Sequence, residues 1–214
     1  MHRDFFGWPE AAFDVLLRLE GDPSTAARES LRKDRERLVR QPMVALMDAL
    51  AFRSELFEDH SVSGFRSTPW WWQHQCAVVR LAKNVEIGLR FDLDGLRLQG
   101  AWWYATPGQV ERYRASVADE ASGSVLANGV GELVDGGYEI TGEKLKRVPQ
   151  GFSADHPRAE LLRHRSLLAV RELGCDDWLH SAEALNRVWL ACRELEPVLF
   201  WLAKHVAPPG AEDR

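Results

Sequence analysis

The chain has few cysteines, no long apolar run and no recognisable catalytic signature. Its three cysteines, Cys76, Cys175 and Cys192, are far apart and form no CxxC pair, which argues against a disulfide scaffold and for reduced thiols. The segment MHRDFFGWPEAAF lacks the basic region and the apolar run of a signal peptide, and no stretch reaches the length of a membrane span. We therefore expect a cytoplasmic protein with no membrane partner.

Positive charge is also in deficit. The chain has 27 Lys and Arg against 32 Asp and Glu, a formal net charge of -5, which argues against nucleic acid as a partner. A length of 214 residues is enough for one well-packed core. We expect a single domain over residues 1–207 and a flexible tail over residues 208–214.

Helical patterns occupy both ends of the chain. The first fifty residues predict three helices, in which Ser24 is placed to cap the second and Pro42 opens the third. The segment from Leu185 to Leu202 repeats apolar residues every three or four positions, so it predicts a long helix that Pro197 should kink.

The middle of the chain alternates apolar and polar residues with the period of two that half-buried strands have. Such runs are CAVVRLA, the segment from Val85 to Phe91 and the segment from Leu96 to Tyr104. Asp94-Gly95 separates the last two runs, which predicts a hairpin whose two turn residues both take positive φ. SLLAVREL predicts a further strand.

Helices are also expected between the strands. Thr106 and Gln109 have the spacing of a capping box, so a helix should run through VERYRASVADE. A short helix is expected from Val125 to Leu133, and Pro157 should open another over RAELLRHR. The pattern as a whole predicts an α+β fold: a single domain with an antiparallel sheet packed by N-terminal and C-terminal helices.

Four segments stand out: FFGWPEAAFDVLLRL, QPMVALMDAL, GQVERYRASVAD and GYEITGEKLKRVPQGFSADHPRAELLRHRSLLAVREL. They resemble segments of domain-of-unknown-function family 2461. Their order and spacing cover most of the chain, which is identified as a diverged member of that family. The resemblance implies a related fold, and it brings no activity, substrate or catalytic residue with it.

The chain departs from the family pattern ahead of the strands. Members carry there a run with Arg-Phe-Ser, Asp-Lys and Pro-Tyr-Lys elements, whereas this chain reads EDHSVSGFRSTPWWWQHQ. Arg66, Thr68-Pro69 and Trp70, in the place of the tyrosine, are comparable, and the lysines are absent. If that run forms the family's functional surface, the altered region 52–75 has lost or changed it.

The segment from Leu145 to Leu168 gathers basic residues within an acidic chain. Guanidinium groups match carboxylate and phosphate geometry, and a helix opened by Pro157 would add free backbone N–H groups. The candidate anion site consists of Arg114, Lys146, Arg147 and His156. The alternative is that Asp155 or His156 only caps that helix and that the cations are solvated. The beginnings of helices commonly have such residues, which favours the alternative.

Trp70, Trp71 and Trp72 form the second candidate site. Three consecutive indoles cannot all point into one core, because they alternate on a strand and fan out on a helix. We interpret them as a candidate interface or aromatic cleft, to which Trp102 and Trp103 would add. Packing beneath a loop explains the same residues equally well.

No metal site or catalytic nucleophile stands out. Two groups of His, Cys and Asp residues lack the paired spacing of structural zinc, so we expect no metal and no cofactor; they are His60, His74 and Cys76, and Cys175, Asp176, Asp177 and His180. Ser153 and Tyr138 are the nucleophiles worth testing, but neither lies in a GxSxG elbow, and no GxGxxG or GxxxxGK[ST] motif is present. Catalytic residues stay unknown.

Two functions fit this sequence. The first is a binding or protein-interaction module, whose tryptophan region and basic segment contact a protein partner or a small anionic ligand. The second is an enzyme acting on a small anionic substrate, in which Arg114, Lys146 and Arg147 hold the charge and His156 is the acid/base. The absence of a catalytic motif and of the family's basic run favours the first. No motif indicates an oligomeric state.

Overall fold

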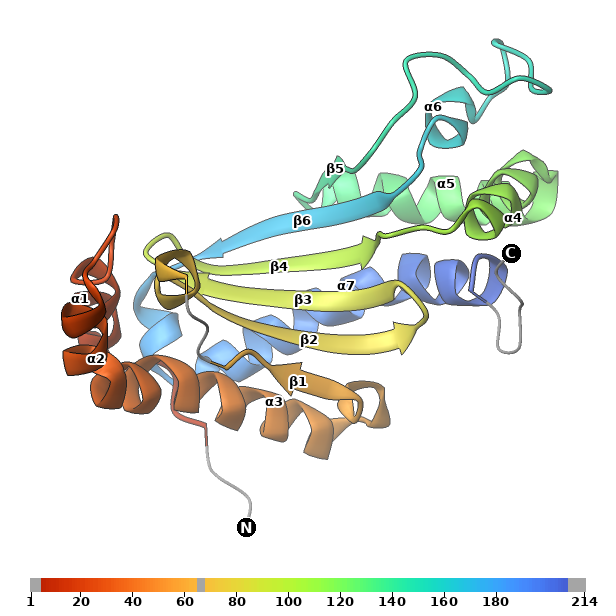
Figure 1. Ribbon diagram of the computed structural model, residues 1–214. Helices are drawn as coiled ribbons and strands as arrows, with labels where there is room; N and C mark the ends of the chain where they lie inside the picture. Colours follow the sequence, from red (N-terminus) through yellow and green to blue (C-terminus); the bar gives the residue numbers. More distant parts are fainter. Residues whose placement is uncertain (1–4, 65–67, 208–214) are drawn as a thin grey trace. The chain divides into compact units, whose positions relative to one another are not determined.

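The computed structural model describes residues 5–64 and 68–207 (Figure 1). Arg66 and the tail expected over residues 208–214 lie outside these described residues. The chain divides into two compact units, and the single domain expected over residues 1–207 stays a prediction. Unit 1 comprises Met1–Val79, Gly88–Leu98 and Glu172–Ala191. Unit 2 comprises Arg80–Ile87, Gln99–Arg171 and Cys192–Arg214.

The N-terminal helices belong to unit 1. They are α1 (Ala11–Leu17), α2 (Thr25–Asp34), the π-helical segment η1 (Arg35–Arg40) and α3 (Gln41–Arg53). The cap predicted for the second helix is confirmed, since Ser24 Oγ accepts the N–H of Ala27. The three predicted helices are present, and Pro42 lies in the first turn of α3, but η1 joins α2 to α3 without a break. Its wider turn directs Arg35 and Val39 into the core of unit 1.

A six-stranded antiparallel sheet runs through the described residues in the order β1-β2-β3-β4-β6-β5 (Figure 1). Its strands are β1 (His60–Val62), β2 (Gln75–Ala82), β3 (Val85–Asp92), β4 (Gly95–Trp102), β5 (Glu139–Thr141) and β6 (Leu167–Gly174). At one edge His60 pairs with Val79, and at the other Glu139 pairs with Val170. The predicted α+β class, with an antiparallel sheet, is confirmed.

The hairpin between β3 and β4 is confirmed, but its turn differs from the prediction. Leu93 and Asp94 make the turn, and Asp92 Oδ1 accepts the N–H of Asp94 at 3.0 Å. Of the expected pair only Gly95 has positive φ, at +97°, as in longer hairpin loops that end on glycine. A Cβ on Gly95 would also collide with the carbonyl of Gly174. Both the backbone angle and this close approach require glycine.

Aromatic side chains join the helices of unit 1 to its strands. Trp8 stacks on Phe91 of β3 with ring centroids 4.8 Å apart, and its indole Nε1 donates to the carbonyl of Val39 at 3.1 Å. Phe57, in the short helix η2 (Glu55–Phe57), packs against Trp189 at 5.8 Å. Trp189 belongs to α7 (Glu183–His205), so the first part of that helix shares this core.

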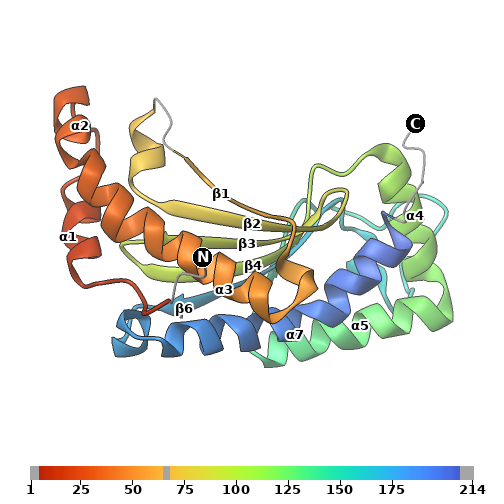
Figure 2. The ribbon, with the colours of Figure 1, turned by 90° about the horizontal axis from the view of Figure 1, so that it is seen from below.

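Unit 2 contains α4 (Pro107–Ala118), α5 (Glu120–Asp135) and the second part of α7. The predicted capping box is confirmed, because Thr106 Oγ1 accepts the N–H of Gln109 and Gln109 Oε1 accepts the N–H of Thr106. Figure 2 shows α5 and the second part of α7 side by side, where Trp201 Nε1 donates to the Ser122 carbonyl at 2.8 Å. These contacts align the start of α5 with the end of α7.

The helix expected from Val125 to Leu133 is longer than predicted. It begins at Glu120, because Asp119 Oδ1 accepts the N–H of Ser122 at 2.8 Å and caps the first turn. The helix expected through VERYRASVADE therefore ends one residue before the Asp119 cap, and Glu120 opens the next helix. The cap explains why an acidic pair precedes a helix rich in small residues.

The helix expected over RAELLRHR is largely absent. It is reduced to α6 (Ala159–Leu162), which has four residues and follows Pro157 and Arg158. The chain turns away because Leu145 N–H donates to the carbonyl of Arg163 at 2.8 Å and Arg165 N–H donates to that of Glu143 at 2.7 Å. Pairing with an extended segment therefore replaces helical bonds, and the free N–H groups of a long helix are not formed there.

The long C-terminal helix is confirmed as α7, with Pro197 inside it. The buried side of its repeat consists of Val188, Cys192, Leu195, Leu199 and Leu202. A Cβ on Gly100 of β4 would lie 2.9 Å from the side chain of Leu195, so strand and helix pack closely within unit 2.

Candidate functional site

The tryptophan segment of unit 1 is held in place by a buried arginine. Arg35 is only 1% exposed, and its guanidinium donates to the carbonyls of Trp72 (2.9 Å), Trp71 (3.2 Å) and His74 (2.6 Å) and to Gln75 Oε1 (3.2 Å). Burial lowers the pKa of Arg35 to about 10, so the group is still a cation at neutral pH. A buried cation is tolerated only when its donors are satisfied. Arg35 therefore determines the backbone path of residues 71–75.

The three tryptophans point in different directions from the short helix η3 (Pro69–Trp72). Trp72 is 2% exposed and belongs to the core, Trp71 is half-buried, and Trp70 is 50% exposed. The rings of Trp70 and Trp71 meet edge to face with centroids 4.9 Å apart. The candidate interface is thus narrower than the sequence indicated, because Trp72 is not available to a partner.

Arginine also reaches the exposed tryptophan. The Arg90 guanidinium of β3 lies 5.6 Å from the centre of the Trp70 ring, within the range of a cation–π contact. Its Nε donates to Asp92 Oδ2 at 2.6 Å, which fixes the side chain. Trp70, Trp71 and Arg90 together form what we call the tryptophan–arginine surface.

His74 lies directly beneath this surface and is 1% exposed. Its ring is 4.1 Å from that of Trp70, and neither ring nitrogen has a hydrogen-bond partner among the described residues. Burial, followed by the charges of Arg90 and Arg35, lowers the pKa of His74 to about 4. At neutral pH the imidazole is therefore neutral, and it neither repels the two arginines nor competes with a ligand for them.

Cys76 follows these groups in the chain as a possible nucleophile, but it is poorly activated. It is half-buried, and burial raises the pKa of its thiol although Arg90 and Arg97 act in the opposite direction. A thiol with a raised pKa is a weak nucleophile at neutral pH. The arginines on this face are balanced in part by acids: Arg97 lies 3.8 Å from Glu172.

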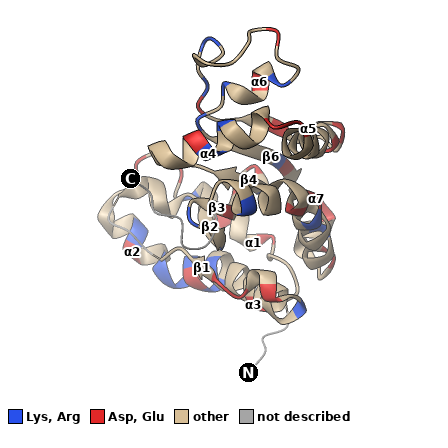
Figure 3. Ribbon diagram, turned by 90° about the vertical axis from the view of Figure 1, so that its right-hand side faces the viewer, with Lys and Arg blue, Asp and Glu red and all other residues tan. Residues whose placement is uncertain are grey.

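The four residues of the candidate anion site lie in unit 2, and among the described residues no hydrogen bond or ion pair joins any two of them. Lys146 and Arg147 are exposed on the loop that leads to α6, where basic residues recur (Figure 3). Arg114 is half-buried on α4, with its Nε buried and unpaired among the described residues. Burial and then the charge of Arg165 lower the pKa of Arg114.

His156 Nδ1 accepts the backbone N–H of Arg158 at 3.0 Å. This bond stays within the loop and is not the helix cap of the alternative interpretation, because no side chain caps the first turn of α6. The ring is half-buried, and the loop around it is not part of any helix. Its second nitrogen is the one left for a ligand.

Other cations of the basic segment are structural. Arg158 is 7% exposed, and its guanidinium donates to the carbonyls of Val117 (2.7 Å), Ala118 (3.2 Å) and Asp119 (3.3 Å) at the end of α4. Arg163 pairs with Glu160, and Arg165 pairs with Glu143. Sequence reasoning counted these side chains as one patch because their long-range partners were not visible.

The remaining sequence candidates do not converge on a reactive centre. Ser153 Oγ accepts the N–H of Asp155 in an exposed turn. Tyr138 is buried, and burial together with Glu194 raises the pKa of its phenol. Over residues 5–64 and 68–207, no three His, Cys, Asp or Glu side chains gather as metal ligands would. In the same part of the chain, no helix combines the length and apolar character that a membrane span requires.

The sheet and its helices define an α+β protein. The chain belongs to the family described as Conserved hypothetical protein (DUF2461), whose model matches residues 71–201. That range covers more than half of the chain and starts inside the tryptophan segment, whereas FFGWPEAAFDVLLRL and QPMVALMDAL precede it. No curated protein and no solved structure matches the chain.

Proposed function

We propose that the chain is a binding protein whose tryptophan–arginine surface takes an acidic peptide segment of a protein partner. The observation that carries this proposal is Trp70, half of whose surface is exposed although the Arg90 guanidinium lies over its ring. Tryptophan and arginine are the side chains that most often dominate binding energy at protein interfaces. A carboxylate matches the guanidinium, and an apolar side chain beside it matches the indole.

Rigidity of the surface supports the same proposal. The hydrogen bonds from Arg35 to the carbonyls of Trp71, Trp72 and His74 hold the segment before any partner arrives. A preorganised surface loses less conformational entropy on binding, so more of the contact energy remains as affinity. The neutral His74 beneath it adds no charge to the surface at neutral pH, and Arg90 is paired with Asp92 through its Nε.

The exposed cations Lys146 and Arg147 extend the proposal to unit 2 as a second contact for acidic groups. The enzyme alternative has less support, because His156 uses one ring nitrogen to accept the Arg158 N–H. A general acid/base needs an enclosed site beside the reacting group. Cytoplasmic localisation stays part of the proposal.

The test is peptide binding to the immobilised full chain, measured by biolayer interferometry. The probes are Glu- and Asp-rich peptides with one aromatic residue, and the same peptides with lysine at every acidic position. We expect Kd values on the order of 10–100 μM for the acidic set, weakened about tenfold or more by Trp70→Ala. Phe6→Ala, which removes another exposed ring of unit 1, is the matched control.

Equal binding of the acidic and basic peptides, or a Trp70→Ala variant that binds as the wild type does, contradicts the proposal. The double variant Lys146→Ala/Arg147→Ala separates the two surfaces. If Lys146→Ala/Arg147→Ala loses less peptide affinity than Trp70→Ala does, the main contact lies on unit 1.

A further inference from the structure

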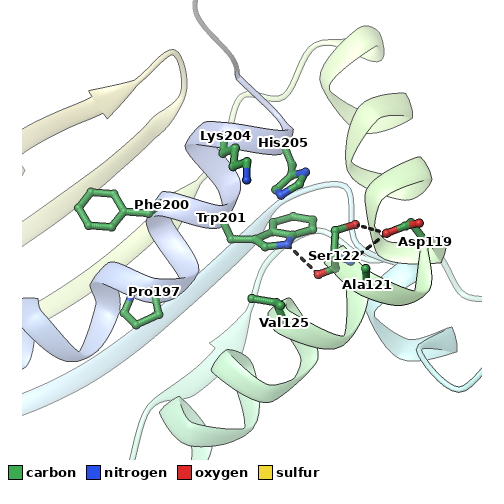
Figure 4. A pocket seen from close by; sticks show the side chains of 9 residues that line it. All are labelled: Asp119, Ala121, Ser122, Val125, Pro197, Phe200, Trp201, Lys204 and His205. Atoms are coloured by element: carbon green, nitrogen blue, oxygen red, sulfur yellow. Dashed lines mark hydrogen bonds between the residues drawn. The ribbon is translucent and has the colours of Figure 1, made fainter.

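Unit 2 contains a cavity that neither candidate site includes. It lies where the start of α5 meets the end of α7 and has a volume of about 490 Å³ (Figure 4). Cavities of this size are typical of sites for small ligands. None of the residues that the sequence analysis put forward as a site lines it.

One side of the cavity is apolar. Val125 of α5 and Phe200 of α7 line it although they are 59% and 49% exposed, and Pro197 and Trp201 complete that side (Figure 4). Trp201 is fixed, because its Nε1 donates to the Ser122 carbonyl at 2.8 Å and its ring stacks on His205 with centroids 4.7 Å apart. The exposed apolar side chains and the fixed indole that line the cavity favour an apolar occupant.

The acidic group at the cavity is already engaged. Asp119 Oδ1 accepts both the N–H of Ser122, at 2.8 Å, and its hydroxyl, at 3.0 Å. These hydrogen bonds lower the pKa of Asp119, so the carboxylate is charged and serves the first turn of α5. Figure 4 shows it directed at Ser122.

The basic group at the cavity is not engaged. Lys204 lines the cavity, is exposed, and makes no hydrogen bond or ion pair with any residue that the structure describes. Lys204 is not needed as a donor to the carbonyl of Val206, just after α7, because Arg112 Nε donates to that carbonyl at 2.9 Å. Burial, followed by the charge of Lys204, lowers the pKa of His205, which leaves a neutral imidazole beside the ammonium.

We propose that this cavity binds a small monocarboxylic acid with an apolar or aromatic body. The carboxylate accepts hydrogen bonds from the Lys204 ammonium and from the His205 ring, and the body lies against Phe200, Val125 and Pro197. An ammonium and a neutral imidazole N–H both donate, so they match an acceptor-only group. An amine of the same shape would meet the Lys204 charge and be repelled.

The experiment uses three probes that share one phenylpropyl body: 3-phenylpropionate, 3-phenylpropylamine and 3-phenylpropanol. Binding to the full chain is measured at neutral pH by ligand-observed NMR and by titration calorimetry. We expect a Kd on the order of 0.1–1 mM for the acid and at least about tenfold weaker binding of the amine and the alcohol. Lys204→Met and Phe200→Ala should each weaken the acid about tenfold, and Lys33→Met, which removes an exposed lysine of unit 1, should not.

Three results overturn the proposal: no binding of the acid, equal binding of the alcohol or the amine, or unchanged binding by Lys204→Met. Lys204 and Phe200 are exposed, and circular dichroism checks that their variants are folded. Trp70→Ala should bind the acid as the wild type does. Failure at this cavity is therefore distinguishable from failure of the peptide-binding function.

Discussion

The guanidinium of Arg35 donates a 2.6 Å hydrogen bond to the carbonyl oxygen of His74, a residue 39 positions further along the chain. This bond joins the π-helical segment η1 to the start of β2. It shows how the only π-helical turn found among the described residues contributes to the candidate surface. The wider turn directs a cation inward, and that cation organises the tryptophan segment.

Replacing Arg35 with methionine should lower the free energy of unfolding by about 3 kcal/mol. The variant leaves the carbonyls of Trp71, Trp72 and His74 without their donor. A hydrogen bond to a charged group contributes about 1.5–3 kcal/mol, and removal of the buried cation offsets part of the loss because its desolvation is no longer needed. Urea denaturation measures the change. Arg37→Met, at an exposed position of the same turn, should alter stability by less than about 0.5 kcal/mol; equal effects of the two variants would contradict the role of Arg35.

His74 should make the protein less stable in mild acid. Its pKa of about 4 in the folded chain lies below the 6.5 of a solvated histidine, so the unfolded chain takes up a proton first as the pH falls. The contribution of His74 to stability is therefore fully present above pH 6.5, is lost between there and pH 4, and does not change below pH 4. A shift of this size corresponds to roughly 3 kcal/mol.

The measurement is the free energy of unfolding against pH for the wild type and for His74→Phe, which keeps a ring beside Trp70. The variant lacks the titrating group, so its curve should be flatter between these two pH values. Parallel curves would show that other groups cause the acid sensitivity.

Gly123 and Gly131, both in α5, should respond to alanine in opposite directions. A Cβ on Gly123 would collide with the carbonyl of Val117 and lie 2.6 Å from Arg158 Nε, whereas a Cβ on Gly131 meets nothing within 4 Å. We expect Gly123→Ala to destabilise by about 2 kcal/mol and Gly131→Ala to stabilise by about 0.5–1 kcal/mol. Thermal unfolding measures both, and a stabilised Gly123→Ala would show that α4 and α5 are not so close.

The three thiols should react at different rates with Ellman's reagent. Cys175 is exposed and should react at once, while Cys192 is buried and burial raises its pKa. Cys76 should be intermediate, because burial also raises its pKa but Arg90 opposes the shift. Cys175→Ser should remove the fast phase, and all three thiols should react in denaturant; rapid reaction of Cys192 in the native protein would contradict its burial.

Local patterns were the part of the fold that could be predicted. The cap at Ser24, the capping box at Thr106 and the strand from Val85 depend on residues within a few positions of one another. The turn at Gly95 was predicted with the wrong geometry, because Leu93 and Asp94 make the turn and only Gly95 takes positive φ. The helix after Pro157 was lost through pairing with a distant segment, Leu145 with Arg163.

The candidate sites show the same division. Trp70 was identifiable because three adjacent indoles cannot share one core, but its partner Arg90 was not. Lys204 and His205 were missed entirely. No signal in the chain linked them to Val125 or Asp119, since the cavity exists only where two helices meet.

The sequence by itself determined the α+β class, the family and the places of most helices and strands, and it singled out an unusual tryptophan segment. These follow from periodicity, caps and turn residues, all of which act over a few positions. The tertiary structure alone decided which cations are structural, as Arg35 and Arg158 are, and which are exposed, as Lys146 and Lys204 are. Burial and hydrogen-bond partners depend on segments far apart in the chain, and they determine whether a charge supports the fold or faces a ligand.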